Sequence, residues 1–325
     1  MSPSLALQVL VSGLAAGALY GLIGLGYSLI YRMSGVLNFA HGDLVTLAVF
    51  AFLLAIGGGG AVGLAGVPAA VMGPAAVLAV AAVMLAALLL HRYGVAPLVA
   101  RDSVVGWIAA TAAAGLLLRS LVGARFQADS YTVPDLLPVS ALGRAGLIDI
   151  PGGGVIAIRS VLVLGIAVAL ALGFDAWLRR SRVGLAMRAA SDDPSTAELV
   201  GVSTRNLRLL AWLIAGFLAA VAGLLVAPSR PVTLELGVIL GLKGTAAAVL
   251  GGLGSARGAV VAGLVLGVVE SLVTTAAIPA IHLGPVDLPA LGPSPGLQDV
   301  AALALLVFML ALFPRRLGRA EDDPD

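Results

Sequence analysis

Apolar stretches of roughly 20 residues recur along the whole chain, separated by short segments that hold arginine, proline or glycine. A helix of about 20 apolar residues is what crosses the hydrocarbon core of a bilayer. Of the 325 residues, 60% are hydrophobic and only 11% are charged, whereas soluble proteins carry about 25% charged residues. The sequence therefore predicts an all-α, polytopic membrane helix bundle that forms a single transmembrane domain, residues 1–325.

Counting the apolar stretches gives eight or nine membrane spans. We expect them at residues 5–31, 36–56, 68–90, 104–122, 160–178, 209–227, 236–250, 259–277 and 297–313. The count is not fixed because two segments, residues 36–45 and 236–250, could be re-entrant or broken: the first is rich in polar groups and the second is short and glycine-rich.

Small residues recur at helical spacing in two of the spans. Gly13, Gly17 and Gly21 follow one another every fourth residue, and a second stripe contains Gly263 and Gly267. Glycine at this spacing removes the side chains from one helix face, so another helix can approach closely. Both stripes are predicted to be packing faces.

The orientation follows from residues 179–208, the one long run that clearly belongs in water. It holds six arginines, Arg179, Arg180, Arg182, Arg188, Arg205 and Arg208, and short basic loops beside membrane spans stay in the cytoplasm. Alternation then puts Arg32, residues 91–101, Arg257 and the basic tail at 315–319 in the cytoplasm as well. The N-terminus is predicted outside and the C-terminus inside, with external segments at residues 123–159 and 278–296.

Within this cytoplasmic loop, residues 193–201 are predicted to form a short helix. Asp193 suits the N-cap and Pro194 the first helical position, where its missing N–H costs nothing. Gly201 can end the helix. Its apolar side chains are Ala197, Leu199, Val200 and Val202. A helix of about two turns is too short to be stable alone, so we expect it to dock against another surface.

Two groups of polar side chains lie within predicted spans. Asn38, His41 and Asp43 open the second span, and they are interpreted either as a functional site or as a helix start that Asn38 caps and whose dipole Asp43 meets. Lys243 and Glu270 are the only deep charges in their spans. Either they form a structural ion pair, which we favour, or they belong to a translocation route.

Several other kinds of site are not indicated. Residues 40–43 resemble the motif of intramembrane aspartyl proteases only in part, and no second span carries the Asp that such chemistry needs. The glycine run at 252–258 does not follow a strand, so a tight turn explains it better than phosphate binding. The three histidines are far apart in the sequence and there is no cysteine, which argues against a metal site. The arginines cluster at membrane edges and do not form a nucleic-acid-binding face.

Three segments in order carry a family resemblance. They are GVLNFAHGD at 35–43, MRAASDDPSTAELVGV at 187–202 and GLKGTAAAVLGGLGSARGAVVAGLVLGVVES at 241–271. Together they closely resemble the branched-chain amino acid ABC transporter permeases, specifically the LivH-type subunit, and the resemblance covers roughly residues 5–318. The chain departs from the family's usual ending, Pro-x-Gly-Leu-Phe-Gly, at residues 314–318.

The resemblance implies an importer subunit of a bacterial cell membrane and not an enzyme. A second, LivM-like permease subunit, two ABC ATPase subunits that bind ATP and Mg, and an external binding protein would be its partners. The segment 193–202 with its short helix would then be the coupling element, with Asp193, Pro194, Ala197, Glu198, Leu199 and Gly201 as its residues. Urea and amide importers share this architecture. The competing hypothesis is a self-sufficient secondary transporter or channel that relays ions through Lys243, Glu270, His41 and Asp43.

Overall fold

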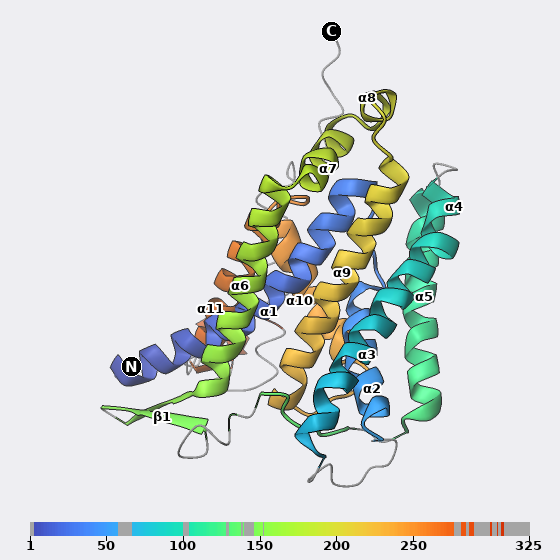
Figure 1. Ribbon diagram of the computed structural model, residues 1–325. Helices are drawn as coiled ribbons and strands as arrows, with labels where there is room; N and C mark the ends of the chain where they lie inside the picture. The colour runs from blue at the N-terminus through green and yellow to red at the C-terminus, as the bar shows by residue number, and fades with distance from the viewer. Residues whose placement is uncertain are drawn as a thin grey trace.

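The chain folds into a bundle of long apolar helices with a helical knob, residues 181–203, at one end and a β-hairpin at the other (Figure 1). The computed structural model describes residues 3–57, 67–99, 104–127, 130–137, 139, 146–151, 153–275, 281–283, 286–288, 300, 304, 307 and 308. In chain order the elements are α1 (Pro3–Ser34), α2 (His41–Ala55), α3 (Ala69–Leu89), η1 (Leu90–Val95), α4 (Ala96–Val99), α5 (Val104–Arg125), β1 (Leu147–Ile150), β2 (Gly154–Ala157), α6 (Ile158–Arg180), α7 (Arg182–Asp192), α8 (Pro194–Leu199), α9 (Thr204–Val226), η4 (Ala227–Ser229), α10 (Leu236–Leu250), α11 (Ala256–Thr275), β3 (Ile281–Leu283) and β4 (Val286–Leu288).

Six helices of the described chain are long and apolar enough to cross a membrane: α1, α3 with its continuation to Leu98, α5, α6, α9 and α11. Two more apolar helices, α2 and α10, have 15 residues each. These helices correspond to the first eight predicted spans. The predicted ninth span, residues 297–313, lies outside the described residues except at four positions. The chain is therefore a multi-pass helical membrane protein.

Two short β-hairpins were missed by the all-α prediction. β1 and β2 pair antiparallel around a turn with Gly153 at φ 87°, inside the segment predicted to be external. This hairpin lies against the start of α1, where the Val155 amide donates to Gln8 Oε1 at 3.3 Å. β3 and β4 pair in the second predicted external segment, residues 278–296. The fold is thus mostly helical, with strands confined to connections.

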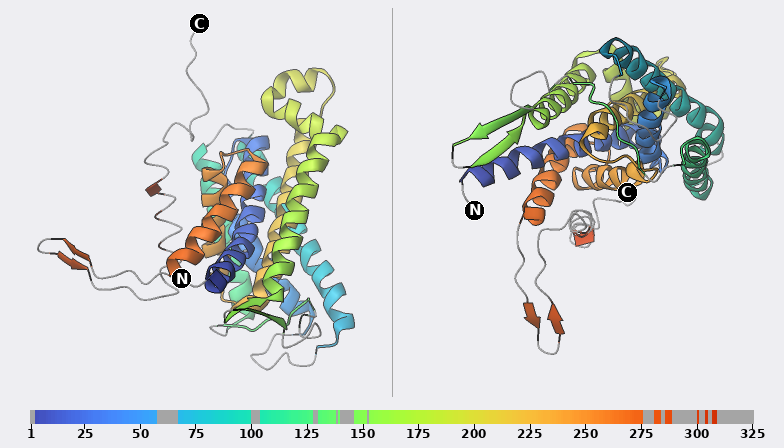
Figure 2. Two further views of the ribbon diagram at one scale, coloured as in Figure 1. Left: turned by 90° about the vertical axis from the view of Figure 1, so that its left-hand side faces the viewer. Right: turned by 90° about the horizontal axis from the view of Figure 1, so that it is seen from below.

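The two predicted glycine stripes meet each other between α1 and α11. Figure 2 shows α1 with α11 on one side and α6 on the other, in agreement with the contacts between these helices. A Cβ atom on Gly17 would lie 2.5 Å from the Gly263 carbonyl oxygen, and one on Gly267 would lie 2.3 Å from the Gly13 carbonyl oxygen. The backbones are therefore in direct contact, which confirms both stripes as packing faces.

Substituting Gly17 by alanine should destabilise the protein by about 1–3 kcal/mol, because the methyl group forces two backbones apart. The matched control is Gly165→Ala on α6, where a Cβ would meet nothing within 4 Å. We expect the control to be neutral or slightly stabilising, since alanine favours helices by about 1 kcal/mol over glycine. Thermal unfolding of the detergent-purified chain measures both, and equal melting temperatures for the two variants would contradict the packing.

The two short helices α2 and α10 cross with their backbones in contact. A Cβ on Gly42 would lie 2.2 Å from the Gly237 carbonyl oxygen, and the Gly237 amide donates to Thr46 Oγ1 at 2.8 Å. Residues 35–40 are not helical, so the predicted break near 36–45 is confirmed. The alternative that residues 236–250 are broken was wrong, because α10 is one continuous helix.

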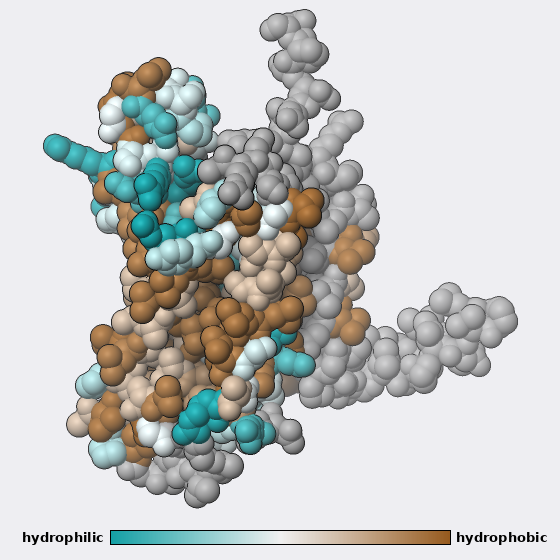
Figure 3. All heavy atoms as spheres, turned by 90° about the vertical axis from the view of Figure 1, so that its right-hand side faces the viewer, coloured by the Kyte–Doolittle hydropathy of each residue, from teal (hydrophilic) through white to brown (hydrophobic). Residues whose placement is uncertain are grey.

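The surface of the helices is apolar between two hydrophilic ends. On the face that carries α3 and α5, Figure 3 shows an apolar band below the hydrophilic knob end. Several large apolar side chains of α3 and α5 are exposed, among them Val77, Leu78, Leu85, Leu89, Leu116, Leu117 and Leu121. Exposed leucine on this scale is what a lipid-facing surface needs, so α3 and α5 present their outer faces to lipid or to another membrane subunit.

Candidate functional site

The predicted short helix at the tip of the knob is present as α8. Asp193 is its N-cap and Pro194 its first residue: Asp193 Oδ1 accepts from the Ser195 and Thr196 amides, both at 3.0 Å. The hydroxyls of these two residues also donate to the carboxylate. These hydrogen bonds to the charged form hold the pKa of Asp193 well below its usual range, so the cap persists throughout the neutral and mildly acidic range.

Gly201 ends α8 as predicted. Its φ of 85° is in the left-handed region that favours glycine, and the Val202 amide donates back to the Ala197 carbonyl at 3.0 Å. Glu198 accepts a hydrogen bond from the Thr204 hydroxyl at the start of α9. Both ends of the short helix are therefore fastened by local hydrogen bonds.

The apolar side chains of α8 point in two directions. Ala197 is 3% exposed, whereas Leu199 is 87% and Val200 is 74% exposed. Ala197 packs inward in an apolar cluster with Leu29, Met33, Met187, Ala190 and Ala211. The inner contact is therefore made within this chain, whereas Leu199 and Val200 are exposed.

The first half of the knob is a helix that the sequence interpretation missed. Residues 179–188 were assigned only a topological role, yet residues 182–192 form α7, with Ser181 Oγ accepting from the Gly184 amide at 2.9 Å. The signal was present as an N-cap serine followed by apolar Met187 and Ala190 three residues apart. Arg32 on α1 donates to Ser191 Oγ at 3.2 Å, so the knob is fixed to the central helix.

The basic segments that were predicted to share one side lie at one end of the bundle wherever the structure describes them, and the basic tail at 315–319 lies outside the described residues. Arg257 at the start of α11 donates to Asp175 on α6 at 3.1 Å, and Asp175 also pairs with Arg179. Arg32, Arg188 and Arg257 line one cavity of about 250 Å³ beneath the knob. Residues 91–101 were predicted to lie in the cytoplasm. Of these, residues 91–99 continue α3 through η1 and α4 and lie at this same end (Figure 1).

Lys243 and Glu270 form the ion pair that the sequence analysis favoured. Lys243 Nζ lies 2.9 Å from Glu270 Oε1, and the two side chains are 2% and 5% exposed. Tyr20 on α1 donates its hydroxyl to the same carboxylate oxygen at 3.2 Å. The Lys243 ammonium lies 5.3 Å from the centre of the Tyr20 ring. The pair therefore ties α10 and α11 to α1 inside the bundle.

Asp43 has a partner that the sequence analysis did not assign to it. Arg119 on α5 donates to Asp43 through Nε at 2.8 Å and through Nη2 at 3.3 Å. Asp43 is 5% exposed and Arg119 is 31% exposed. Asp43 lies in the first turn of α2, as the helix-start interpretation expected, and the non-helical residues 35–40 precede this helix. An arginine from the far half of α5 can reach it there.

Asn38 and His41 are fully buried beside this ion pair. Asn38 Oδ1 accepts from the Ala40 amide at 3.1 Å, so it closes a turn before α2 and does not cap the helix itself. Its amide nitrogen has no hydrogen-bond partner among the described residues. The His41 ring packs edge-on against Tyr27 with 4.5 Å between ring centres. The structure thus joins Asn38, His41 and Asp43 at the start of α2.

Removing one partner of the Asp43–Arg119 ion pair should lower the free energy of unfolding more than removing both partners. Arg119→Gln leaves a buried carboxylate without its cation, and we expect about 1–3 kcal/mol of lost stability. Asp43→Asn together with Arg119→Gln removes the unpaired charge and should recover part of that loss. Denaturant unfolding of four proteins, the parent, Arg119→Gln, Asp43→Asn and the double variant, measures the coupling, and additive losses would show that the two side chains do not interact.

The polar candidates therefore form two ion-paired groups on opposite sides of α10, and the coupling candidates form a third group on the knob. The Asp43 group lies where α2 crosses α10, and Lys243 faces α1 and α11. Among the described residues there is no cluster of three or more His, Asp or Glu side chains that could hold a metal. The described chain is thus a helix bundle that contains two ion pairs with buried members and carries a knob at one end.

Comparison with known proteins assigns this bundle to a family. Residues 9–310 match the family described as branched-chain amino acid transport system / permease component. The chain belongs to this family. The permease is 30% identical over 318 residues to the high-affinity branched-chain amino acid transport system permease protein BraD of Pseudomonas aeruginosa, covering 97% of this chain and 96% of that protein.

Other relatives carry related names. The permease is 28% identical over 319 residues to the high-affinity branched-chain amino acid transport system permease protein LivH of Escherichia coli, covering 97% and 96% of the two chains. Among solved structures, PsaBC from Streptococcus pneumoniae in complex with Fab aligns with a TM-score of 0.46 and 11% identity, covering 94% of this chain and 90% of that one. A likeness this remote says nothing about function.

Proposed function

We propose that this permease is the transmembrane subunit of an ATP-binding-cassette importer that moves branched-chain, hydrophobic amino acids into a bacterial cell across its inner membrane. Family membership and relatives named as branched-chain amino acid permeases support this proposal. An external binding protein delivers the substrate, and a second, LivM-like permease subunit completes the pathway. Two ABC ATPase subunits bind ATP and Mg and supply the energy by hydrolysis, so this chain is not itself an enzyme.

The observation that carries the proposal is the two-sided helix α8. Asp193, Pro194 and Gly201 hold a short helix in one conformation, and Ala197 and Glu198 fasten it to the bundle. Leu199 and Val200 project outward as bare apolar side chains. A rigid helix with an apolar tip suits insertion into a groove of an ATPase subunit, whose displacement would then reach α6 and α9 directly.

The knob end would be cytoplasmic in this proposal, with the C-terminus, and the N-terminus would be external. The arginines at 32, 92, 179, 188, 205 and 257 lie at the knob end, which agrees with the positive-inside rule. The β1–β2 hairpin at the opposite end would face the binding protein.

The substrate path would pass the buried start of α2. Short helices that begin inside a bundle, next to irregular backbone, are a common device of transporter sites. Asn38 and His41 are the candidates to line it, because they are fully buried there. The Lys243–Glu270 and Asp43–Arg119 pairs would hold the helices in register. Nothing favours an ion relay through them, since each charge already has a partner.

Transport by the assembled complex tests the proposal. The chain is co-expressed with its permease partner, ATPases and binding protein, and uptake of labelled leucine, isoleucine and valine is measured in proteoliposomes with and without internal ATP. We expect uptake that needs both ATP and the binding protein, and that unlabelled branched-chain amino acids suppress. Preferential uptake of urea or an amide would show that the substrate belongs to that class and is not a branched-chain amino acid. Proton-driven uptake by the chain alone would overturn the ATP-dependent mechanism.

A further inference from the structure

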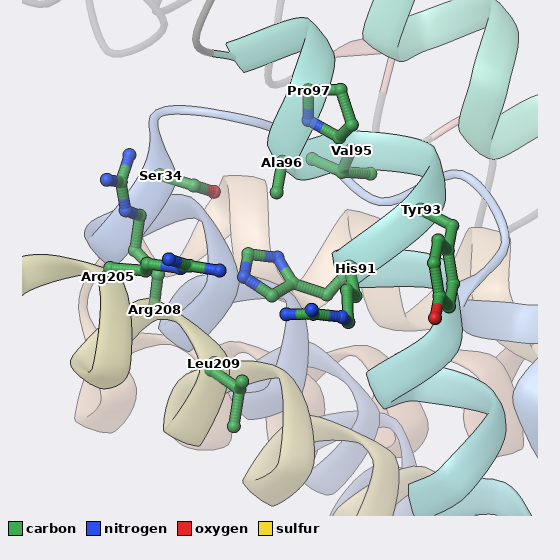
Figure 4. Close-up of a pocket in the computed structure, with 10 residues that line it drawn as sticks. Ser34, His91, Tyr93, Val95, Ala96, Pro97, Arg205, Arg208 and Leu209 are labelled. Carbon is green, nitrogen blue, oxygen red and sulfur yellow. The ribbon is translucent and has the colours of Figure 1, made fainter.

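A basic pocket lies at the knob end, between the end of α3 and the start of α9. It has a volume of about 500 Å³ and is lined by Ser34, His91, Arg92, Tyr93, Val95, Ala96, Pro97, Arg205, Arg208 and Leu209. In Figure 4 the His91 ring lies between η1 and α9 and faces the side chains of Arg205 and Arg208. Three arginines and a histidine thus converge on one cavity, and no carboxylate from the described residues lines it.

The positive charge of this pocket is not neutralised within the described part of the chain. None of Arg92, Arg205 and Arg208 forms an ion pair there, although other arginines of this end do, such as Arg179 and Arg257 with Asp175. Like charges held together without a counter-ion repel one another. An anion in the pocket would remove this repulsion.

His91 adds a buried polar atom that points to a ligand. The residue is 6% exposed, and its ring packs at 5.5 Å from the Trp212 ring, which fixes its orientation. Its Nδ1 atom is buried without a hydrogen-bond partner among the described residues. A buried imidazole nitrogen without a partner costs free energy, and a ligand in the cavity can supply that partner.

The position of the pocket beside an apolar helix surface indicates which class of anion it binds. The exposed leucines of α3 run along the helix to Leu89, which is 46% exposed and directly precedes η1. Val105 at the start of α5 is 78% exposed. Tyr93 is 71% exposed, as suits an aromatic side chain at the headgroup level of a bilayer. An apolar surface therefore leads directly into a basic pocket, which matches the two parts of a phospholipid.

We propose that this pocket, between η1 and the start of α9, binds the phosphate headgroup of an anionic phospholipid whose acyl chains lie along α3 and α5. Arg92, Arg205 and Arg208 hold the phosphate, because guanidinium groups bind its oxygens in pairs. His91 Nδ1 contacts the remainder of the headgroup. The lipid would join the α3–α5 side of the bundle to α9, which leads into the knob. The assignment is independent of the transported substrate.

Lipid retention by the full chain tests the proposal. The detergent-purified protein is titrated with phosphatidylglycerol and, separately, with zwitterionic phosphatidylcholine, and bound lipid is counted by native mass spectrometry. We expect one tightly held phosphatidylglycerol and no equivalent phosphatidylcholine. Arg92→Gln and Arg208→Gln should each weaken binding about tenfold, and the triple variant with Arg205→Gln should weaken it at least a hundredfold. If the triple variant does not fold, the two single variants still test the site.

The matched control is Arg180→Gln with Arg182→Gln, since these arginines lie at the same end without lining the pocket. The control should retain phosphatidylglycerol as the parent does. Equal binding of both lipids, or normal binding by the triple variant, would overturn the site. Displacement by inorganic phosphate at equal concentration would assign it to free anions. Binding only after neutralisation of Glu321, Asp322, Asp323 and Asp325 would mean that the acidic tail fills the pocket, and would also overturn the proposal.

Discussion

Replacing Leu199 and Val200 by aspartate should abolish transport while leaving the permease folded. The two side chains are 87% and 74% exposed, so the chain's own packing does not depend on them. Burying a leucine and a valine in a partner is worth about 3–6 kcal/mol together, which corresponds to about two to four orders of magnitude in affinity. We expect the ATPase subunits to be lost on purification and ATP-dependent uptake to fall to background.

The matched control for this variant is Ile148→Asp with Leu147→Asp. These β1 side chains are also apolar and are 48% exposed each, but they lie at the hairpin end. The ATPases should remain bound to the control. Normal uptake by the α8 variant would remove the coupling assignment.

Ala197→Trp tests the inner face of α8. The larger side chain overpacks the cluster around Met33 and Met187, and we expect the ATPases to bind but no longer drive transport.

Breaking the Lys243–Glu270 pair should have the second large effect, on assembly of the bundle. Both side chains are almost fully buried, and removing one partner of such a pair typically costs about 3–5 kcal/mol because the other charge is left unpaired. Lys243→Met and Glu270→Gln should therefore each lower the yield of folded protein and its melting temperature. The charge swap, Lys243→Glu with Glu270→Lys, should recover part of both.

The swap also separates the two roles that the sequence left open. If the pair is purely structural, the charge swap should restore stability and uptake together. Stability that recovers while uptake stays absent would show that one of these charges acts in the translocation route. A swap that is no more stable than either single variant would argue that the pair does not hold the helices together. Tyr20→Phe is a milder companion, since it removes one hydrogen bond to Glu270 and retains the ring beside Lys243.

The sequence predicted the elements whose determinants are local. Apolar length located eight of the helices, and the run Asp193-Pro194 with Gly201 located α8 to within two residues, because caps act on their nearest backbone groups. The pairing of Lys243 with Glu270 also followed from spacing, since a short turn joins α10 and α11 and limits where their charges can meet.

What the sequence could not predict depends on tertiary placement. Arg119 and Asp43 are 76 positions apart, and their pairing requires that α2 begin deep in the bundle after a non-helical segment. Nothing local marks that depth. The opposite orientation of Ala197 and Leu199 likewise depends on where α1 and α9 lie. The pocket around His91 is formed by segments more than a hundred residues apart, so no single motif indicates it.

The glycine contacts between α1 and α11 have a mechanical consequence. The two backbones touch directly at these glycines, so there are no side chains whose rotamers could change to accommodate a shift. Sliding one helix past the other would therefore bring backbone carbonyl groups into collision. The Lys243 ion pair clamps α10 to the same unit. These three helices should thus move as one rigid body. The hinge of an alternating-access cycle should then lie elsewhere, and the π-helical turn η1, which follows α3 and also packs against α5, is the candidate.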